Sequence, residues 1–491
     1  MAGGSNRLRV LFVSSEIYPL AKTGGLADVC GSLPMALSQE GDIDMVLMLP
    51  GYDSVFNLIK DWEELAALPE LPGGPGRLLL GSMPDTGLRV VVLDQPQSFR
   101  RQGSPYLDEN GKDWADNAQR FAALCHAAAH MAQGKILPLW RADVVHCNDW
   151  HTALIPAVLA AMPGRKPRTV FTLHNLAFQG LFPPELLSEL GLPDSFFSVD
   201  GVEFFGRISF LKAGLNFADK LTTVSPSYAE EITMPEFGMG LDGVLTRRKA
   251  DLSGILNGID DALWNPESDP VLPMRYSAED PLNKEICKQQ IQREWGLEID
   301  AAAPLFVFAA RLEPQKMADT LLEIMPQLLG RPGVQLALVG QGSRPLQDGF
   351  REWAERVPGR VAARIGYRED WAHQLLAGGD MLVHGARFEP CGLTPMYAMR
   401  YGAVPIVRAV GGLRDSVTPV NDESLDTGEA SGFHFAPPTG AGLMEAVDHA
   451  LSLFRQRPHW RRIQQAGMRK DFSWQFPAQQ YRRLYSELAA A

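Results

Sequence analysis

The sequence predicts an α/β protein that contains two doubly wound parallel sheets. Short apolar segments alternate with helix-compatible segments in both halves of the chain, as expected for strands joined by crossover helices. Turn-forming clusters of Gly, Pro, Ser and Asn separate these segments. The 491 residues suffice for about three domains of average size, or for two large α/β domains.

Composition narrows the classes of function. Hydrophobic residues make up 45% of the chain and charged residues 21%, which is typical of a soluble globular protein. The formal net charge of −12 argues against nucleic acid as a partner, although a local basic pocket could still hold an anionic small ligand. No apolar run approaches the ~20 residues of a membrane-spanning helix, so we expect no membrane partner.

The cysteines indicate a reducing compartment. Five are scattered along the chain: Cys30, Cys125, Cys147, Cys287 and Cys391. No two of them form a CxxC pair, which predicts neither a zinc site nor a disulfide framework. The apolar run at residues 10–13 is too short for the core of a signal peptide. We therefore expect a cytoplasmic protein.

The first half of the chain carries apolar segments that are typical of buried strands. The main ones are residues 9–14, 42–49, 142–146, 169–173 and 221–225. Shorter strands are expected at residues 78–80 and 89–93, and helices at residues 29–37 and 117–133. A turn-rich segment begins at residue 254, so we predict an N-terminal domain that spans residues 1–253.

The alternation restarts in the second half. Strands are predicted at residues 305–309, 334–339, 361–365, 381–383 and 404–407. Helices are predicted at residues 318–329, with a bend at Pro326, and at about residues 346–356. These elements form a second domain, residues 254–470. The last segment, 471–491, contains a helix whose apolar stripe must be covered, and we expect it to pack on the N-terminal domain.

One loop of the second domain carries the first candidate site. Glu389 follows the strand predicted at residues 381–383, and ligands of open α/β sheets bind outside the carboxyl ends of the strands. Gly392, Leu393 and Thr394 lie at the expected start of a helix, where free amide groups and the helix dipole attract anions. This combination suits a ligand that is both polar and phosphorylated. The alternative is an exposed loop acid.

Two other loops suit the same kind of ligand. Lys22, Gly24 and Gly25 lie between a strand and a helix, so a point charge and exposed amides could bind phosphate. This loop matches neither GxGxxG nor the P-loop spacing, and an ordinary turn is an equal alternative. Arg311 and Lys316 follow the first strand of the second domain. They would suit a diphosphate, or else form a pair of surface cations.

Polar residues also follow two strands of the first domain. Asp149 comes after the strand at residues 142–146, and His174 comes after the strand at residues 169–173. The alternatives are a helix N-cap for Asp149 and a structural role for His174. Because polar residues follow four strands in this way, we favour a shared cleft.

The ordered motifs resemble the bacterial glycogen synthase and plant starch synthase family. The matching segments are Lys22–Asp28, Asp149–His151, Leu173–Asn175, Gly254–Asp260, Trp264–Pro266, Arg311–Leu312, Gln315–Lys316, Arg387–Thr394, Gly411–Leu413 and Phe472–Trp474. They extend over nearly the whole chain. Members of this family are GT-B glucosyltransferases, so the resemblance implies two Rossmann-like domains that face each other across a deep cleft. It also implies that closure of the domains assembles the site.

The resemblance further implies a reaction and its residues. Glucose would pass from ADP-glucose to the non-reducing end of an α-1,4-glucan such as glycogen, with retention at the anomeric carbon and without a cofactor or metal. The N-terminal domain would serve the glucan and the C-terminal domain the ADP-glucose. The implied catalytic residues are Glu389, Arg311, Lys316, His174 and Asp149. The implied substrate-binding residues are Lys22, Gly24, Gly25, Asn257, Tyr367, Cys391, Gly392, Leu393, Thr394 and Tyr106.

Some features of the resemblance leave alternatives open. The second glutamate of the related E-x7-E pattern is replaced by Tyr397, so we favour a same-face mechanism over a covalent glucosyl intermediate. Met317-Ala318 stands where the family usually has a Gly after the Gln-Lys pair, and Pro395 stands where Gln is usual. UDP-glucose could be the donor, or glucose 1-phosphate the acceptor. A weakly active glucan- or nucleotide-sugar-binding protein is the alternative from another class.

Overall fold

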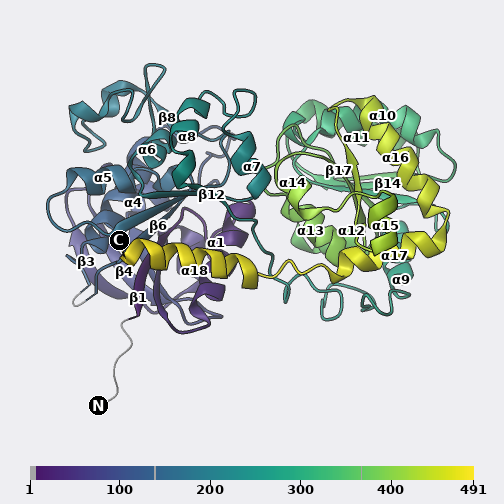
Figure 1. The fold of residues 1–491 in the computed structure, drawn as a ribbon, viewed down its shortest axis with the longest axis horizontal. Helices are drawn as coiled ribbons and strands as arrows, with labels where there is room; N and C mark the ends of the chain where they lie inside the picture. Colours follow the sequence, from purple (N-terminus) through teal and green to yellow (C-terminus); the bar gives the residue numbers. More distant parts are fainter. Residues whose placement is uncertain (1–6, 138–139, 367, 491) are drawn as a thin grey trace, which may run out of the picture. The chain divides into compact units, whose positions relative to one another are not determined.

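The computed structural model describes residues 7–137, 140–366 and 368–490. By internal contacts the chain divides into two compact units (Figure 1). Unit 1 consists of Met1–Gly258 and Trp474–Ala491, and unit 2 consists of Ile259–Ser473. Both unit boundaries lie a few residues beyond the predicted domain boundaries, at residues 253 and 470. The glucan-side and donor-side roles of the two domains stay predictions.

Unit 1 is built on a nine-stranded sheet of order β12-β11-β7-β6-β1-β2-β5-β4-β3. The parallel strands are β1 (Leu8–Val13), β2 (Ile43–Pro50), β5 (Arg89–Asp94), β6 (Val144–Asn148), β7 (Arg168–Leu173), β11 (Lys220–Thr223) and β12 (Leu252–Gly254). The antiparallel edge is formed by β4 (Gly76–Ser82) and β3 (Glu63–Leu68). β1 lies in the middle, and its Val10–Val13 segment is fully buried. Burial of both faces explains why β1 is apolar without alternation.

Helices and a small second sheet complete unit 1. The helices are α1 (Gly25–Ser38), α2 (Asp53–Leu58), α3 (Pro96–Phe99), α4 (Asn117–Ala132), α5 (Ile155–Ala161), α6 (Phe210–Phe217), α7 (Pro226–Glu231) and α8 (Asp242–Arg247). The three-stranded sheet has the order β8 (Leu181–Phe182), β10 (Arg207–Ser209) and β9 (Glu203–Phe204). The sequence analysis missed this sheet and strand β3. Their strands are short or lie at an edge, and they lack the long apolar runs of central strands.

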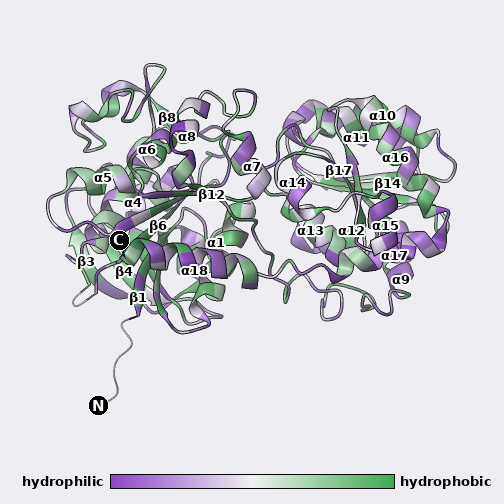
Figure 2. Ribbon diagram, viewed as in Figure 1, coloured by the Kyte–Doolittle hydropathy of each residue, from purple (hydrophilic) through white to green (hydrophobic). Residues whose placement is uncertain are grey.

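Unit 2 is a six-stranded parallel sheet of order β15-β14-β13-β16-β17-β18. Its strands are β13 (Leu305–Ala309), β14 (Gln335–Gly340), β15 (Val361–Ile365), β16 (Met381–His384), β17 (Val404–Arg408) and β18 (Phe433–Phe435). Its helices are α9 (Lys284–Glu294), α10 (Ala318–Leu329), α11 (Arg344–Arg356), α12 (Glu369–Gly378), α13 (Leu393–Arg400), α14 (Gly411–Ser416), α15 (Asp422–Thr427), α16 (Gly440–Phe454) and α17 (Arg457–Arg469). Figure 2 shows helices that carry both hydrophobic and hydrophilic residues, as amphipathic layers over a sheet require. The predicted pair of parallel α/β sheets is confirmed.

The last helix, α18 (Gln475–Ala490), belongs to unit 1. In Figure 1 this yellow helix lies beside the purple α1, which it contacts. The Tyr485 hydroxyl lies 2.6 Å from Nδ1 of buried His146 on β6, and Arg482 donates 3.0 Å to the Leu37 carbonyl at the end of α1. Tyr481, Tyr485 and Leu488 are buried. The end of the chain therefore forms part of the layer that covers the sheet of unit 1.

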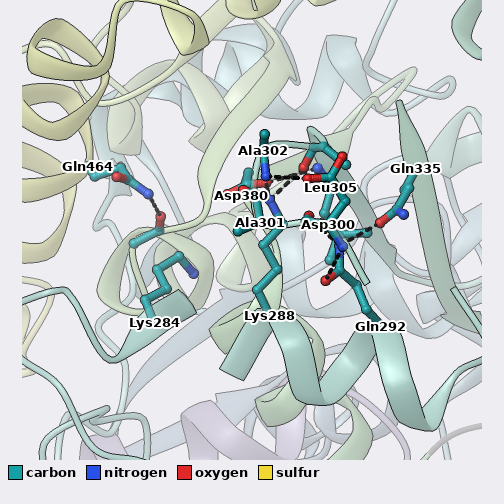
Figure 3. A network of polar contacts seen from close by, with 12 residues as sticks. Lys284, Lys288, Gln292, Asp300, Ala301, Ala302, Leu305, Gln335, Asp380 and Gln464 are labelled. Carbon is teal, nitrogen blue, oxygen red and sulfur yellow. Dashed lines mark hydrogen bonds and ion pairs between the residues drawn. The ribbon is translucent and has the colours of Figure 1, made fainter. Parts of the chain in front are cut away.

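Buried lysines join helix α9 to the sheet and helices of unit 2 (Figure 3). Lys288 Nζ lies 2.7 Å from Asp380 Oδ2, which also accepts the Leu305 amide at 2.9 Å and so links the starts of β13 and β16. Lys284 Nζ donates to the carbonyls of Ala377 at 2.7 Å and Tyr401 at 2.9 Å, at the ends of α12 and α13. Burial lowers the pKa of Lys284 to about 8. The ammonium group satisfies carbonyls at the negative ends of both helices and fixes α13, whose start carries the Glu389 loop.

Among the described residues, no helix is long and apolar enough to cross a membrane. In the same residues, no three His, Cys, Asp or Glu side chains are grouped to hold a metal ion. All five cysteines lie among the described residues, where they are buried and form no disulfide.

Candidate active site

In unit 1, the loop after β1 carries the predicted anion-binding residues. Lys22 Nζ lies 2.8 Å from Asp28 Oδ1 and 5.1 Å from the centre of the Tyr18 ring. Gly24 is the N-cap of α1 and Gly25 is its first residue, and both are exposed. The start of this helix therefore lies at the surface, where the helix dipole favours an anion, although the Gly24 amide also bonds to the carboxylate of Glu16.

Asp149 has a strained backbone and an incompletely paired carboxyl group. Its φ of 60° and ψ of 180° lie in a region that essentially only glycine populates, at a cost of roughly 1–3 kcal/mol. It precedes a short 3-10 helix but makes no side-chain capping bond. Oδ1 is buried and has no hydrogen-bond partner among the described residues. Burial raises the pKa of Asp149 to about 7, although the amide groups of Trp150, Asn175 and His174 oppose the rise. Asp149 is thus the N-cap residue by position, as the alternative expected, but its side chain does not cap the helix.

His174 and Asn257 follow two other strands of the same sheet. His174 Nε2 lies 3.0 Å from Oδ1 of Asn148, the last residue of β6, and burial lowers the pKa of His174 well below its usual value. Asn257 lies just beyond β12; its side chain is buried, and Oδ1 has no partner among the described residues. Asn257 and Asp149 thus each leave one buried oxygen that can accept a hydrogen bond from a ligand.

Tyr106 joins this group from a loop far away in the sequence. Its ring stacks on His151 with the ring centres 4.5 Å apart, and His151 is two residues from Asp149. The Tyr106 hydroxyl donates to a carboxylate oxygen of Glu16, which the sequence analysis did not select. Glu16 also lies just beyond the carboxyl end of β1, so its place in the sequence offered the same signal as Asp149 and His174.

In unit 2, Glu389 is part of a buried charge cluster. Oε2 accepts hydrogen bonds from Lys316 Nζ and, at 3.1 Å, from Nε2 of buried His384. Burial acts to raise the pKa of Glu389, but the cation of Lys316 and the His384 bond outweigh it and hold the pKa at about 2. Both of these bonds go to Oε2, so Oε1 remains able to accept one from a ligand. The alternative of an exposed loop acid is wrong.

Hydrogen bonds hold the two loops of this cluster together. The Arg387 amide donates 2.8 Å to the Gln315 carbonyl, and the Gln315 side chain donates 3.3 Å to the Phe388 carbonyl. Arg387 also forms a forked pair with Asp319, at 3.0 and 2.8 Å. Arg311 is exposed and donates 2.7 Å to Oε1 of Gln315. The guanidinium group of Arg311 is therefore accessible in the loop that supplies Lys316.

Helix α13 starts immediately after Glu389. Its N-cap, Gly392, has a φ of 84°, and a Cβ there would lie 2.5 Å from the Leu413 side chain, so glycine is required on both counts. Leu393 and Thr394 form the first turn of α13, and Cys391 is buried beside it. Tyr367, the residue expected near the adenine, lies outside the described residues.

The two departures from the family pattern fit the local structure. Met317 adopts the left-handed conformation, with a φ of 52°, at the N-cap of α10, and its side chain is buried against Gly385. Glycine would adopt this conformation without cost, whereas methionine gains burial there. Pro395 lies in the first turn of α13, where its missing N–H group would have no helical partner in any case.

The structure therefore assembles two groups of predicted residues. In unit 1, the carboxyl edge of the sheet carries Lys22, Gly24, Gly25, Tyr106, Asp149, His174 and Asn257. In unit 2, the corresponding edge carries Arg311, Lys316, Glu389, Cys391, Gly392, Leu393 and Thr394. Glu16, His151 and His384 are additional polar residues that the sequence analysis did not select.

Comparisons with known proteins define the class. Residues 9–247 match the model of the starch synthase catalytic domain, and residues 290–466 match that of glycosyl transferases group 1. The fold is shared with sucrose-phosphate synthase from Thermosynechococcus elongatus, with a TM-score of 0.61 and 18% identity over 99% of this chain and all of that one. The two family models, together with the two parallel α/β units, define the class as a GT-B glycosyltransferase.

Closer relatives define the family. A glycogen synthase from Burkholderia thailandensis is 49% identical over 97% of this chain and 90% of its own length, and one from Rhodopseudomonas palustris strain TIE-1 is 48% identical over 98% and 99%. The catalytic domain of starch synthase IV from Arabidopsis thaliana, bound to ADP and acarbose, has a TM-score of 0.89 and 30% identity over 99% of this chain and all of that one. The chain belongs to the glycogen synthase and starch synthase family of glucosyltransferases.

Proposed function

We propose that the protein is a cytoplasmic glycogen synthase that transfers glucose from ADP-glucose to the non-reducing end of an α-1,4-glucan, with retention of configuration. The observation that carries the proposal is the Glu389 cluster: a buried, ionised carboxylate held by Lys316. Arg311 is accessible in the same loop. The starch synthase IV structure, which is similar over nearly the whole chain, holds ADP and acarbose, and this supports a nucleoside diphosphate and a glucan as ligands.

The residues of unit 2 suit the donor. Arg311 supplies a planar guanidinium group that can form forked hydrogen bonds with a phosphate, and Lys316 supplies a point charge. The amide groups of Leu393 and Thr394 at the start of α13 add a second source of positive potential. Together they would stabilise the charge that develops on the diphosphate as the bond to glucose breaks.

Glu389 is suited to bind the glucose that is transferred. Oε2 is occupied by Lys316 and His384, which leaves Oε1 to accept a hydrogen bond from a glucose hydroxyl. In the reaction the bond between the anomeric carbon and the phosphate oxygen breaks, and the acceptor 4-hydroxyl oxygen attacks from the same face. The acceptor proton passes to the departing phosphate oxygen. Glu389 therefore positions the sugar and favours its developing positive charge without forming a covalent bond.

The residues of unit 1 suit a carbohydrate chain and the transferred glucose. Asp149 and Asn257 each offer a buried oxygen that lacks a partner among the described residues. His174 offers a neutral imidazole, since burial lowers its pKa. Tyr106 is half-buried and stacks on the buried His151, and its ring is of the kind that packs against sugar rings. Lys22 and the exposed residues Gly24 and Gly25 would meet the donor from unit 1.

Radiolabel transfer to glycogen tests the proposal. Wild-type protein is expected to transfer glucose from ADP-glucose faster than from UDP-glucose, and Glu389→Gln is expected to lose most of this activity. Glu352→Gln is the matched control, because Glu352 lies exposed on α11. Faster transfer from UDP-glucose would contradict ADP-glucose as the donor. Transfer only to glucose 1-phosphate would contradict a glucan as the acceptor. Binding of nucleotide sugar without transfer to any acceptor would indicate a binding protein.

A further inference from the structure

Glu16 contacts two parts of unit 1 that are far apart in the sequence. It lies three residues beyond β1 and is only 2% exposed. A buried carboxylate is costly unless it is well hydrogen-bonded. Its partners therefore show what the carboxylate stabilises.

The first partner is the loop that carries Lys22. Both the amide and the hydroxyl of Thr23 donate to Glu16, the hydroxyl over 2.6 Å to Oε1. Thr23 itself is exposed, and it directly precedes the N-cap Gly24. These two bonds fix the backbone immediately before the exposed amide groups at the start of α1. Without them, an exposed loop that ends in two glycines would sample many conformations.

The second partner is Tyr106. Its hydroxyl donates to Oε1 of Glu16 and lies 2.8 Å from Oγ of Ser15. The ring of Tyr106 also stacks on His151, which is two residues from Asp149. The hydrogen bond to Glu16 therefore helps to fix the position of the Tyr106 ring against His151.

We propose that Glu16 is a positioning residue that couples the donor-side loop, residues 22–25, to the acceptor-side Tyr106. The proposal rests on the donor and glucan roles assigned above to these two segments. One oxygen, Oε1, accepts from both the Thr23 hydroxyl and the Tyr106 hydroxyl. A shift of either segment therefore changes the hydrogen bonding available to the other.

The choice of a carboxylate fits this role. The amides of Thr23 and Gly24 and the hydroxyls of Thr23 and Tyr106 converge on Glu16, and an ionised carboxylate accepts several hydrogen bonds without offering a donor of its own. Glutamine has the same shape, but one of its two terminal groups is a donor. Glu16→Gln should therefore keep the packing and lose part of the coupling.

Hydrogen exchange on ligand-free protein is the first test. In Glu16→Gln, amide exchange should accelerate by about tenfold or more in the peptides that cover residues 17–30 and 100–118, while the rest of unit 1 is unchanged. Glu109→Gln is the control, since Glu109 is exposed in the Tyr106 loop. Acceleration in only one of the two peptides, or in neither, would overturn the proposal. This readout needs no transferase activity, so it separates failure of the coupling from failure of the proposed function.

Kinetics supply the second test. Glu16→Gln should raise KM for ADP-glucose and for glucan together, by about three- to tenfold each, whereas Tyr106→Phe should act mainly on the glucan KM. Adding Tyr106→Phe to Glu16→Gln should then raise the glucan KM by less than it does alone. Independent, multiplicative effects would contradict the coupling.

If Glu16→Gln does not fold, Thr23→Val and Tyr106→Phe replace it. Each removes one hydroxyl donor and leaves the carboxylate in place. Tyr106→Phe should accelerate exchange in residues 17–30, and Thr23→Val should accelerate it in residues 100–118. Exchange that stays confined to the substituted segment would overturn the proposal.

Discussion

Asp149 of unit 1 and Glu389 of unit 2 are both buried carboxyl groups, yet their environments act in opposite directions. Burial raises the pKa of Asp149 to about 7, because only backbone amides oppose it. At Glu389 burial acts in the same sense, but Lys316 and His384 bring the pKa to about 2. A buried carboxyl group is thus kept ionised when a cation touches it, and is easily protonated when none does. The two groups are therefore suited to different tasks at neutral pH.

The largest expected effect comes from removing the cation. Lys316→Met should lower kcat by about 100- to 1,000-fold, because the charge that we propose to stabilise the departing diphosphate is lost. It should also raise the pKa of Glu389, since burial then acts with only the His384 bond against it. The residual activity of Lys316→Met should decrease toward acidic pH, because Glu389 becomes protonated there. The wild-type activity should show no decrease from Glu389 titration above pH 4.

Lys249→Met provides the control for this substitution, because Lys249 is exposed. An unchanged kcat in Lys316→Met would contradict both the proposed role of the cation and the contrast between the two carboxyl groups.

The second test is the pH dependence of the unfolding free energy in a variant of Asp149. The folded-state pKa of about 7 lies above the ordinary value of 3.8. This carboxyl group therefore contributes stability that is complete below pH 3.8 and is lost as the pH rises through 7. Asp149→Asn should gain up to about 4 kcal/mol in unfolding free energy relative to wild type between pH 4 and pH 8.

Denaturant titrations at the two pH values measure this gain. Asp85→Asn, on an exposed loop, should show no pH-dependent difference from wild type. The same Asp149→Asn protein should transfer glucose much more slowly, so activity and stability should change in opposite directions at pH 8. A stability difference that is independent of pH would contradict the raised pKa of Asp149.

A smaller effect is expected at His384, which supports the ionised state of Glu389 from within strand β16. His384→Leu removes the 3.1 Å hydrogen bond to Oε2, and a bond to a charged group is worth about 1.5–3 kcal/mol. We expect kcat to fall by about tenfold with little change in the KM for glucan. His384→Gln keeps a donor and should recover part of this loss. Equal losses in both variants would indicate packing rather than hydrogen bonding.

The smallest effect is the difference in stability between two substitutions of Met317, the residue that follows Lys316. Met317→Ala and Met317→Gly both lose the buried side chain and should be destabilised by about 2–5 kcal/mol. Only glycine is free of strain at a φ of 52°, so Met317→Gly should be the more stable of the two by about 1 kcal/mol. Thermal unfolding of the two variants measures this difference. An alanine variant that is as stable as the glycine variant would contradict the strain at this position.

Strand order and the carboxyl-end rule explain why the positions of most candidate residues in the fold could be predicted from sequence. Glu389, Asp149 and His174 each follow an apolar run, and in a parallel sheet such residues meet at one edge. Pairing between side chains could not be predicted in the same way. His384 lies inside a buried strand and reads as a core residue, while its contact with Glu389 depends on how the loop turns back.

The backbone and loop conformations of the site could not be predicted from the sequence either. Nothing in the Asn-Asp-Trp sequence predicts the φ of 60° at Asp149, which requires the surrounding sheet to hold it. Glu16 had the right position after β1, but its partners Thr23 and Tyr106 become visible only when the loops are folded. Strand β3 and the small three-stranded sheet lacked a long apolar run and were missed for that reason.

The return of α18 to unit 1 has a consequence for synthesis of the protein. Residues up to Gly258 are synthesised first, but the helix that covers part of their sheet is synthesised only after all of unit 2. Until it arrives, His146 lacks the hydroxyl of Tyr485, and the residues that Tyr481 and Leu488 pack against are uncovered. Translation must therefore pass through all of unit 2 before unit 1 can complete its fold. A nascent chain that stalls near residue 470 should expose apolar surface and bind chaperones.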